Sequence, residues 1–129
     1  MKKSFYLSVL KDDFAVCRLN AFDGVPSWVL ENPLSSVTRT AEELSIVCPM
    51  NTIPNEIQCE QEWKCLKIHG PLDLGEVGVI SNLTSVLAKA DISVFVLSTY
   101  ETDYILVNKM NLDKAAKALT EKGHQLYYD

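Results

Sequence analysis

The chain has 129 residues, enough for one compact domain or two very small ones that share a core. Its 12 basic and 17 acidic residues give a net charge of −5, and neither half is basic, which disfavours a nucleic-acid surface. The apolar patch near the start is too short and too polar for a signal peptide, and no run reaches the length of a membrane span. We therefore expect a folded cytoplasmic protein with neither nucleic acid nor membrane as a partner.

The cysteines and histidines indicate whether the protein has a disulfide scaffold, a metal site or reduced thiols. The four cysteines show no C-x-x-C pairing and sit among strand-like residues, so we expect buried free thiols in a reducing cytosol. The two histidines stand near neither each other nor a cysteine pair, so we expect no metal and no cofactor. These residues are Cys17, Cys48, Cys59, Cys65, His69 and His124.

The first half of the chain alternates short apolar stretches with turn residues. The polar segments K-D-D and A-E-E each separate two apolar stretches and predict two hairpins. Pro26 and Pro33 leave room for one helical turn, and Pro49 and Pro54 bound a loop. The predicted strands are 5–10, 14–19, 35–40, 44–48 and 57–61, with the helical turn at 27–31.

The second half has longer elements. Residues 63–69, W-K-C-L-K-I-H, alternate apolar and polar side chains as a half-buried strand does. Apolar residues at three- and four-residue steps predict amphipathic helices over 77–90 and 112–122, the second with Asn111 as its N-cap and Gly123 as its stop. The remaining predicted strands are 92–97, 104–109 and 125–128.

Residues 63–128 thus follow the order β-α-β-β-α-β, which is the ferredoxin-like layout with two helices on one face of an antiparallel sheet. The first half has a similar rhythm of strands with helices shortened to proline-bounded turns, which indicates a diverged repeat. We therefore predict an α+β protein with domains over 1–61 and 62–129. An exposed sheet edge in so small a unit favours pairing with a second copy.

The loop G-P-L-D-L-G-E-V-G leads into the first long helix, where unpaired N–H groups favour an anion. Gly75 and Gly78 would let a ligand approach the backbone closely. The pattern is neither G-x-G-x-x-G nor a P-loop, so a small carboxylate fits better than a nucleotide phosphate. A purely structural role also fits, with Gly75 in a turn, Gly78 in helix packing and Glu76 in the first helical turn.

The segment S-T-Y-E-T-D, residues 98–103, joins two apolar strands without the glycine that a hairpin tip usually carries. Asp103 adjoins a strongly apolar strand, where a carboxylate needs a partner for its charge, and a ligand ammonium or guanidinium would be one. An aspartate that caps the turn through backbone N–H groups explains the same residue equally well. Both interpretations stay open on the residues alone.

Catalysis finds little support in the residues. Local sequence suggests no cluster of serine, histidine and aspartate, and there is no G-x-S-x-G elbow. Both histidines fall at predicted strand ends, where surface positions are more typical than catalytic bases. Acylphosphatases share the ferredoxin-like layout but bind phosphate through an arginine in a glycine-rich loop, and the corresponding loop here has no arginine. We expect no enzyme.

With these segments in place, the chain resembles the small tandem ACT-domain proteins, regulatory modules that commonly bind free amino acids. The resemblance covers nearly the whole chain and rests on F-A-V-C-R-L and S-V-T-R-T-A-E-E-L-S-I-V-C-P in the first half. In the second half it rests on W-K-C-L-K-I-H-G-P-L-D, G-V-I and I-S-V-F-V-L-S-T-Y-E-T-D-Y-I-L-V. The ACT repeats of the animal cytosolic arginine sensor are similar.

In that sensor the amino acid lies between neighbouring ACT domains, and the resemblance implies where the contacts fall here. The backbone of loop 73–78 would hold the α-carboxylate, Glu76 and Asp103 the positive end, and Tyr100 the aliphatic stem. Asp73 stands where the sensor has a glycine, and two domains replace the sensor's four, so an equivalent pocket needs a second chain. The implied ligand-binding residues are Asp73, Leu74, Gly75, Glu76, Ile80, Ser93, Val94, Thr99, Tyr100 and Asp103.

The resemblance therefore implies a non-catalytic, allosteric regulatory protein of the cytoplasm, active as a homodimer. It would bind a free amino acid or a similar small metabolite at an inter-domain or dimer interface. The alternative is a scaffold module that keeps the ACT fold for protein interaction and binds no ligand.

Overall fold

The structure is a computed structural model that describes residues 4–69 and 78–128. The chain forms two compact units. The inserted unit comprises residues 12–63, and the split unit comprises residues 1–11 together with 64–129. The predicted domains, 1–61 and 62–129, stay a prediction; by contacts, the first eleven residues group with the C-terminal segment.

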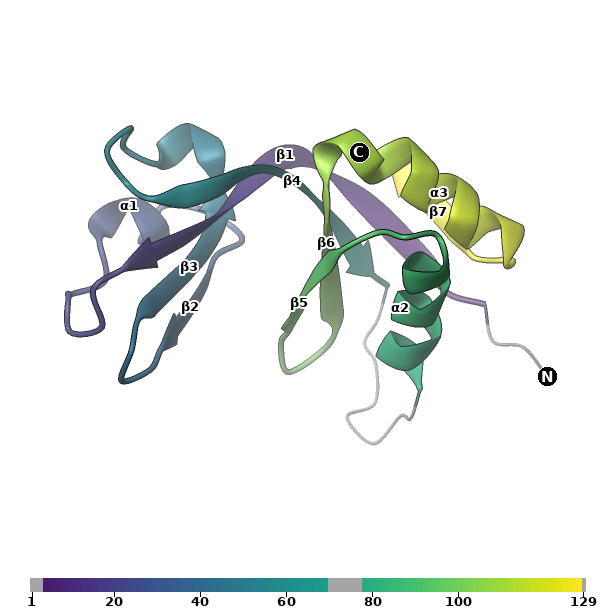
Figure 1. Ribbon diagram of the computed structural model, residues 1–129, viewed down its shortest axis with the longest axis horizontal. Coiled ribbons are helices and arrows are strands. Elements are labelled where there is room, and N and C mark those ends of the chain that lie inside the picture. The colour runs from purple at the N-terminus through teal and green to yellow at the C-terminus, as the bar shows by residue number, and fades with distance from the viewer. Residues whose placement is uncertain (1–3, 70–77, 129) are drawn as a thin grey trace. The chain divides into compact units, whose positions relative to one another are not determined.

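Twelve elements follow one another along the described residues, and Figure 1 labels all of them except the two 3-10 turns. Among the described residues, none of the helices is both long and apolar enough to span a bilayer. The first six elements are β1 (Tyr6–Leu19), α1 (Ser27–Leu30), β2 (Ser36–Arg39), β3 (Leu44–Pro49), the 3-10 turn η1 (Met50–Thr52) and β4 (Cys59–Ile68). The other six are α2 (Val79–Lys89), β5 (Val94–Ser98), β6 (Asp103–Asn108), the 3-10 turn η2 (Lys109–Asn111), α3 (Leu112–Glu121) and β7 (Gln125–Tyr128).

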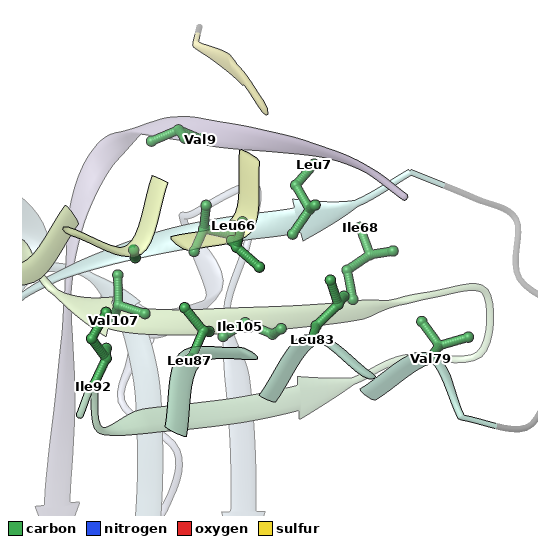
Figure 2. Packing of buried hydrophobic residues seen from close by; sticks show 12 residues of the cluster. Leu7, Val9, Leu66, Ile68, Val79, Leu83, Leu87, Ile92, Ile105 and Val107 are labelled. Carbon is green, nitrogen blue, oxygen red and sulfur yellow. The ribbon is translucent and has the colours of Figure 1, made fainter. Parts of the chain in front are cut away.

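The helices α2 and α3 cover one face of the sheet in the split unit. Alternate strand residues on β1, β4 and β6 bury their side chains in one cluster with residues of both helices. Figure 2 shows Leu83 and Leu87 of α2 pointing toward Leu66 and Ile105. This arrangement confirms the predicted α+β fold with helices on one face of the sheet. The members are Leu7, Val9, Leu66, Ile68, Val79, Leu83, Leu87, Ile92, Ile105, Val107, Ala115 and Leu119.

A strand from the N-terminus completes the predicted β-α-β-β-α-β segment. The strand order in the split unit is β7-β1-β4-β6-β5, so the start of β1 lies between β7 and β4. Tyr6 pairs with Gln125 and Val9 with Tyr128 in parallel register. Leu7 and Val9 are at most 3% exposed, which explains why this apolar stretch belongs with the C-terminal elements.

The predicted hairpin around K-D-D is wrong, because β1 runs unbroken from Tyr6 to Leu19. Backbone bonds join His69 to Tyr6 at 2.8 Å and Arg18 to Gln58 at 3.0 Å, so β4 pairs antiparallel to β1 along both stretches. Between these bonds β1 spans one more residue than β4, as a β-bulge requires. The polar segment 11–13 therefore lies within a strand and makes no turn.

The second predicted hairpin and the helical turn of the first half are confirmed, with one further correction. In the inserted unit β2 pairs with β3 and β3 with β1, both antiparallel, and α1 occupies the predicted helical turn. The separate predicted strands 57–61 and 63–69 form the single strand β4, with Glu62 at a positive φ of 64° inside it. The core of this unit consists of Ala15, Cys17, Val29, Leu44, Ile46 and Cys48.

The ends of α3 differ in how well the sequence predicted them. Gly123 follows the helix with φ 92°, the left-handed conformation expected of a glycine stop. Asn111 makes no side-chain capping bond, because it belongs to η2, whose turn runs directly into α3. The predicted N-cap position of Asn111 and the helix start at Leu112 are therefore confirmed, whereas the side-chain bond that a capping asparagine usually makes is missing.

Candidate functional site

The hairpin between β5 and β6 closes through its own side chains. Ser98 and Asp103 are Cα partners at the ends of the two strands. The Ser98 hydroxyl donates a hydrogen bond to Asp103 Oδ1 at 2.6 Å. The half-buried carboxylate therefore has a partner within the chain, which neither interpretation of the sequence foresaw.

The four tip residues, 99–102, need no glycine. The Thr99 N–H donates to the Thr102 carbonyl at 2.8 Å, and the Thr102 N–H donates to Thr99 Oγ1 at 3.3 Å. None of these tip residues has a positive φ. Since only left-handed backbone favours glycine, threonine hydroxyls close this turn without it.

A buried threonine ties the tip to the neighbouring strand β4. Thr102 is 7% exposed, and its hydroxyl donates to the Ile68 carbonyl at 2.6 Å. Sequence reasoning missed Ser98 and Thr102. The hairpin register places Ser98 opposite Asp103, whereas the partner of the Thr102 hydroxyl lies on β4.

Tyr100 contributes little to the fold. It is 82% exposed at the tip and followed by the exposed Glu101. An aromatic ring that leaves most of its apolar surface in water has a large area available for a ligand or a partner.

The start of α2 lies at the same end of the split unit as the hairpin tip, as Figure 1 and Figure 2 both show. Gly78 precedes the helix with φ 90°, a conformation that a side chain would strain. Ile80 is half-buried and packs against the apolar cluster of the split unit, so this packing explains why an apolar residue stands at position 80. The predicted residues Asp73, Leu74, Gly75 and Glu76 lie outside the described residues.

Ser93 and Val94 lie at the other end of β5 from the tip. Ser93 is exposed immediately before the strand, and Val94 packs against the apolar cluster. Val94 pairs with Val107, whereas Ser98 pairs with Asp103. Val94 and Ser98 are therefore four residues apart along β5, at about 3.4 Å per residue. The contacts predicted at residues 93–94 lie that far from those predicted at the hairpin tip. One copy of the hairpin does not bring them together.

His124 directly precedes β7, at a strand end as expected, but it is buried and does not lie at the surface. It is 3% exposed, its Nδ1 accepts the Phe5 N–H at 3.1 Å, and its ring stacks on Phe5 at 5.6 Å between centroids. Burial lowers the pKa of the His124 imidazole. No pattern in the sequence signals this, because Phe5 is 119 residues away.

A hollow of about 370 Å³ runs along α2, and none of the predicted site residues lines it. The described residues contain no group of three histidine, cysteine or acidic side chains arranged to hold a metal. The lining residues are Ser81, Asn82, Ser85, Val86, Lys89, Lys122 and His124.

Comparison with known proteins places these features in a family. A family model described as an ACT domain matches residues 58–121, and another, described as an N-terminal domain, matches residues 12–56. A protein of Agrobacterium tumefaciens is 34% identical over 99% of this chain and 96% of its own, with a TM-score of 0.93.

Two further solved structures share the fold. A Vibrio cholerae protein of unknown function is 23% identical over 92% of this chain and 90% of its own, with a TM-score of 0.74. The ligand-free regulatory subunit of aspartate kinase from Thermus thermophilus is 10% identical over 87% of this chain and 93% of its own, with a TM-score of 0.60. The chain therefore belongs to the family of the Agrobacterium tumefaciens protein and is an ACT-domain protein, with its ACT domain at residues 58–121.

Proposed function

We propose that this ACT-domain protein is a non-catalytic regulator that binds a free amino acid or a similar small metabolite between two copies of the chain. The ACT domain supports a regulatory role, as does the shared fold with a regulatory subunit of aspartate kinase. Four cysteines without a disulfide support a cytoplasmic setting. The tandem arrangement, with the inserted unit as a diverged ACT repeat, is part of the proposal.

The hairpin tip is the observation that carries this proposal. It holds the exposed Tyr100 beside the half-buried Asp103, at the same end of the split unit as the start of α2. The Ser98 bond uses Oδ1 of Asp103 and fixes the carboxylate in place. In the proposed complex Oδ2 accepts from the ligand's cationic group, and Tyr100 packs against its aliphatic part.

The second copy follows from the position of Ser93 and Val94. Because they lie at the opposite end of the hairpin from Tyr100, they reach a ligand at the tip only from another copy. The sequence prediction adds Glu76 to the cationic end of the ligand and the backbone of residues 73–75 to its carboxylate.

The expected contacts are strong enough for a metabolite. A charge-assisted hydrogen bond contributes about 1.5–3 kcal/mol. Three or four of them, less the ordering of ligand and side chains, reach the roughly −8 kcal/mol of a micromolar ligand. Binding at a boundary between copies would bias assembly, which is how a domain without catalysis transmits a signal.

A scaffold that binds no ligand is the second candidate, and the tip bonds favour it. Ser98 already satisfies one oxygen of Asp103, and the threonines close the turn unaided. On this reading the exposed Tyr100 contacts a protein partner.

A thermal-shift screen of the twenty amino acids at millimolar concentration separates the two. At a concentration 1,000 times the dissociation constant, a ligand stabilises the native state by about 4 kcal/mol. We expect one amino acid to raise the melting temperature of the wild type, and light scattering to show a dimer with it bound.

Tyr100→Ala should abolish the shift while leaving the unliganded protein as stable as before, because the ring is exposed. Asp103→Asn should abolish it for a cationic ligand. Ser98→Ala keeps the carboxylate and removes only the bond that fixes it, so this variant should weaken the shift without abolishing it. If no amino acid shifts the melting temperature, the scaffold function stands instead.

A further inference from the structure

Three of the four cysteines lie together in the inserted unit. Cys17 on β1 is 1% exposed, Cys48 on β3 is fully buried, and Cys59 on β4 is half-buried against the same cluster. In this unit β1 lies between β3 and β4, so Cys17 has a cysteine-bearing strand on each side. Cys65 is buried in the split unit.

The strand register makes Cys59 the direct neighbour of Cys17. The Arg18 N–H donates to the Gln58 carbonyl at 3.0 Å, so Cys17 and Cys59 face each other at the next, non-hydrogen-bonded position. Such positions bring Cα atoms to about 4.5 Å, within the roughly 4.4–6.8 Å range of disulfides. The Cys59 thiol contributes to the raised pKa of Cys17, which agrees with two neighbouring sulfurs.

Cys48 is less well placed to join Cys17. Cys17 pairs with Ile46 and Cys48 pairs with Ala15, so the two cysteines are diagonal neighbours. Diagonal positions on adjacent strands are about 7–8 Å apart between Cα atoms, beyond the range of an unstrained disulfide.

The two opposed thiols differ in burial. Burial raises the pKa of Cys17 to about 12, so this residue stays a thiol at neutral pH, whereas the thiolate is the form that attacks an oxidant. Cys59 is more exposed, on the last strand of the inserted unit, and is followed by the exposed residues 60–62. The Gln61 amide donates to Cys59 Sγ at 3.5 Å, which places an exposed polar group beside this sulfur.

We propose that Cys59 is a site of oxidation by peroxide and that Cys17 converts the product into a disulfide. The Cys59 thiolate attacks hydrogen peroxide, an S–O bond forms as the O–O bond breaks, and hydroxide leaves. The Cys17 sulfur then attacks Cys59 Sγ, an S–S bond forms, and the S–O bond breaks. The departing oxygen takes the Cys17 proton and leaves as water. Two thiols lose two electrons in total, and peroxide is reduced to two waters.

The bond would close a loop that holds most of the inserted unit. Residues 17–59 contain α1, β2, β3 and η1. Cross-linking the ends of such a loop restricts the unfolded chain and stabilises the folded unit. A cytosolic disulfide of this kind is transient, which suits a reversible change in the stability of one unit.

The test uses the full chain treated with hydrogen peroxide and then denatured in excess maleimide. We expect two of the four thiols to escape alkylation, the mass to fall by two hydrogens before alkylation, and peptide mapping to join Cys17 to Cys59. The melting temperature should rise, and dithiothreitol should reverse every change. Four alkylated thiols, a bond that includes Cys48 or Cys65, or a bond between two chains would overturn the proposal.

Variants assign the two roles. Cys59→Ser should prevent loss of thiols at the other positions, and Cys17→Ser should stop the reaction at a sulfenic acid that dimedone traps on Cys59. Cys65→Ser is the matched control and should form the bond as the wild type does. The mapping of the wild type decides the matter even where a buried variant folds poorly.

Discussion

The cores of the two units differ in the residue types and the secondary-structure elements that form them. The split unit buries aliphatic side chains from α2, α3 and several strands in one cluster. The inserted unit has a single helix of four residues, Val29 is the only residue of that helix that is buried, and two of its six core members are cysteines. Small cores bury a smaller fraction of their apolar surface, so the inserted unit depends more on each contact. This contrast predicts where mutations act and where oxidation acts.

The largest effect should come from the helix face of the split unit. Leu83 is fully buried between α2 and the sheet, so Leu83→Ala should lower the free energy of unfolding by about 2–5 kcal/mol. Urea denaturation monitored by circular dichroism measures this. Met110→Ala is the control, because Met110 is 84% exposed and should change stability by less than about 0.5 kcal/mol. A loss below about 1 kcal/mol in Leu83→Ala would contradict the burial of Leu83 between α2 and the sheet.

The hairpin tip should show the next largest effect. Thr102→Val keeps the shape of the side chain and removes the donor to the Ile68 carbonyl, leaving a buried acceptor without that bond. We expect a loss of about 1–3 kcal/mol in unliganded protein. Thr99→Val is the comparison, since the hydroxyl of this exposed residue makes longer bonds of 3.2 and 3.3 Å. Equal losses of stability in both variants would show that the burial of Thr102 does not increase the cost of removing its hydroxyl.

The inserted unit should respond more modestly, through α1. Val29→Ala removes two buried carbons, each worth about 0.8 kcal/mol, so the loss should be about 1.5 kcal/mol. Leu30→Ala on the same helix is the matched control, because Leu30 is 73% exposed. Hydrogen exchange of residues 12–63 measures the change locally. If both variants behave alike, α1 does not cover the core of this unit.

The sequence predicted the split unit better than the inserted one for a physical reason. Helical periodicity records which face of α2 and α3 is buried, so both helices and the glycine stop at Gly123 were found. The unbroken β1 was missed, because polar K-D-D looks the same in a bulged strand and in a turn. The bond between Ser98 and Asp103 depends on hairpin register, which composition does not encode. The tip was singled out as a candidate site from its residues, and the ligand-binding set came from the family resemblance.

The smallest effect should be a pH dependence in the split unit. Burial holds the pKa of His124 below its value of about 6.5 in the unfolded chain, so the unfolded state binds the proton first as the pH falls. The contribution of neutral His124 to the free energy of unfolding is therefore complete above pH 6.5. Below pH 6.5 this contribution declines until the pH reaches the lower pKa of the folded state. The decline is at most about 1.4 kcal/mol per pH unit. Urea midpoints between pH 7.5 and 5.5 measure this slope. His124→Gln can still accept the Phe5 N–H and should flatten it, whereas His69→Gln, at an exposed position, should leave the His124 contribution in place. An unchanged slope in His124→Gln would assign the pH dependence to other groups.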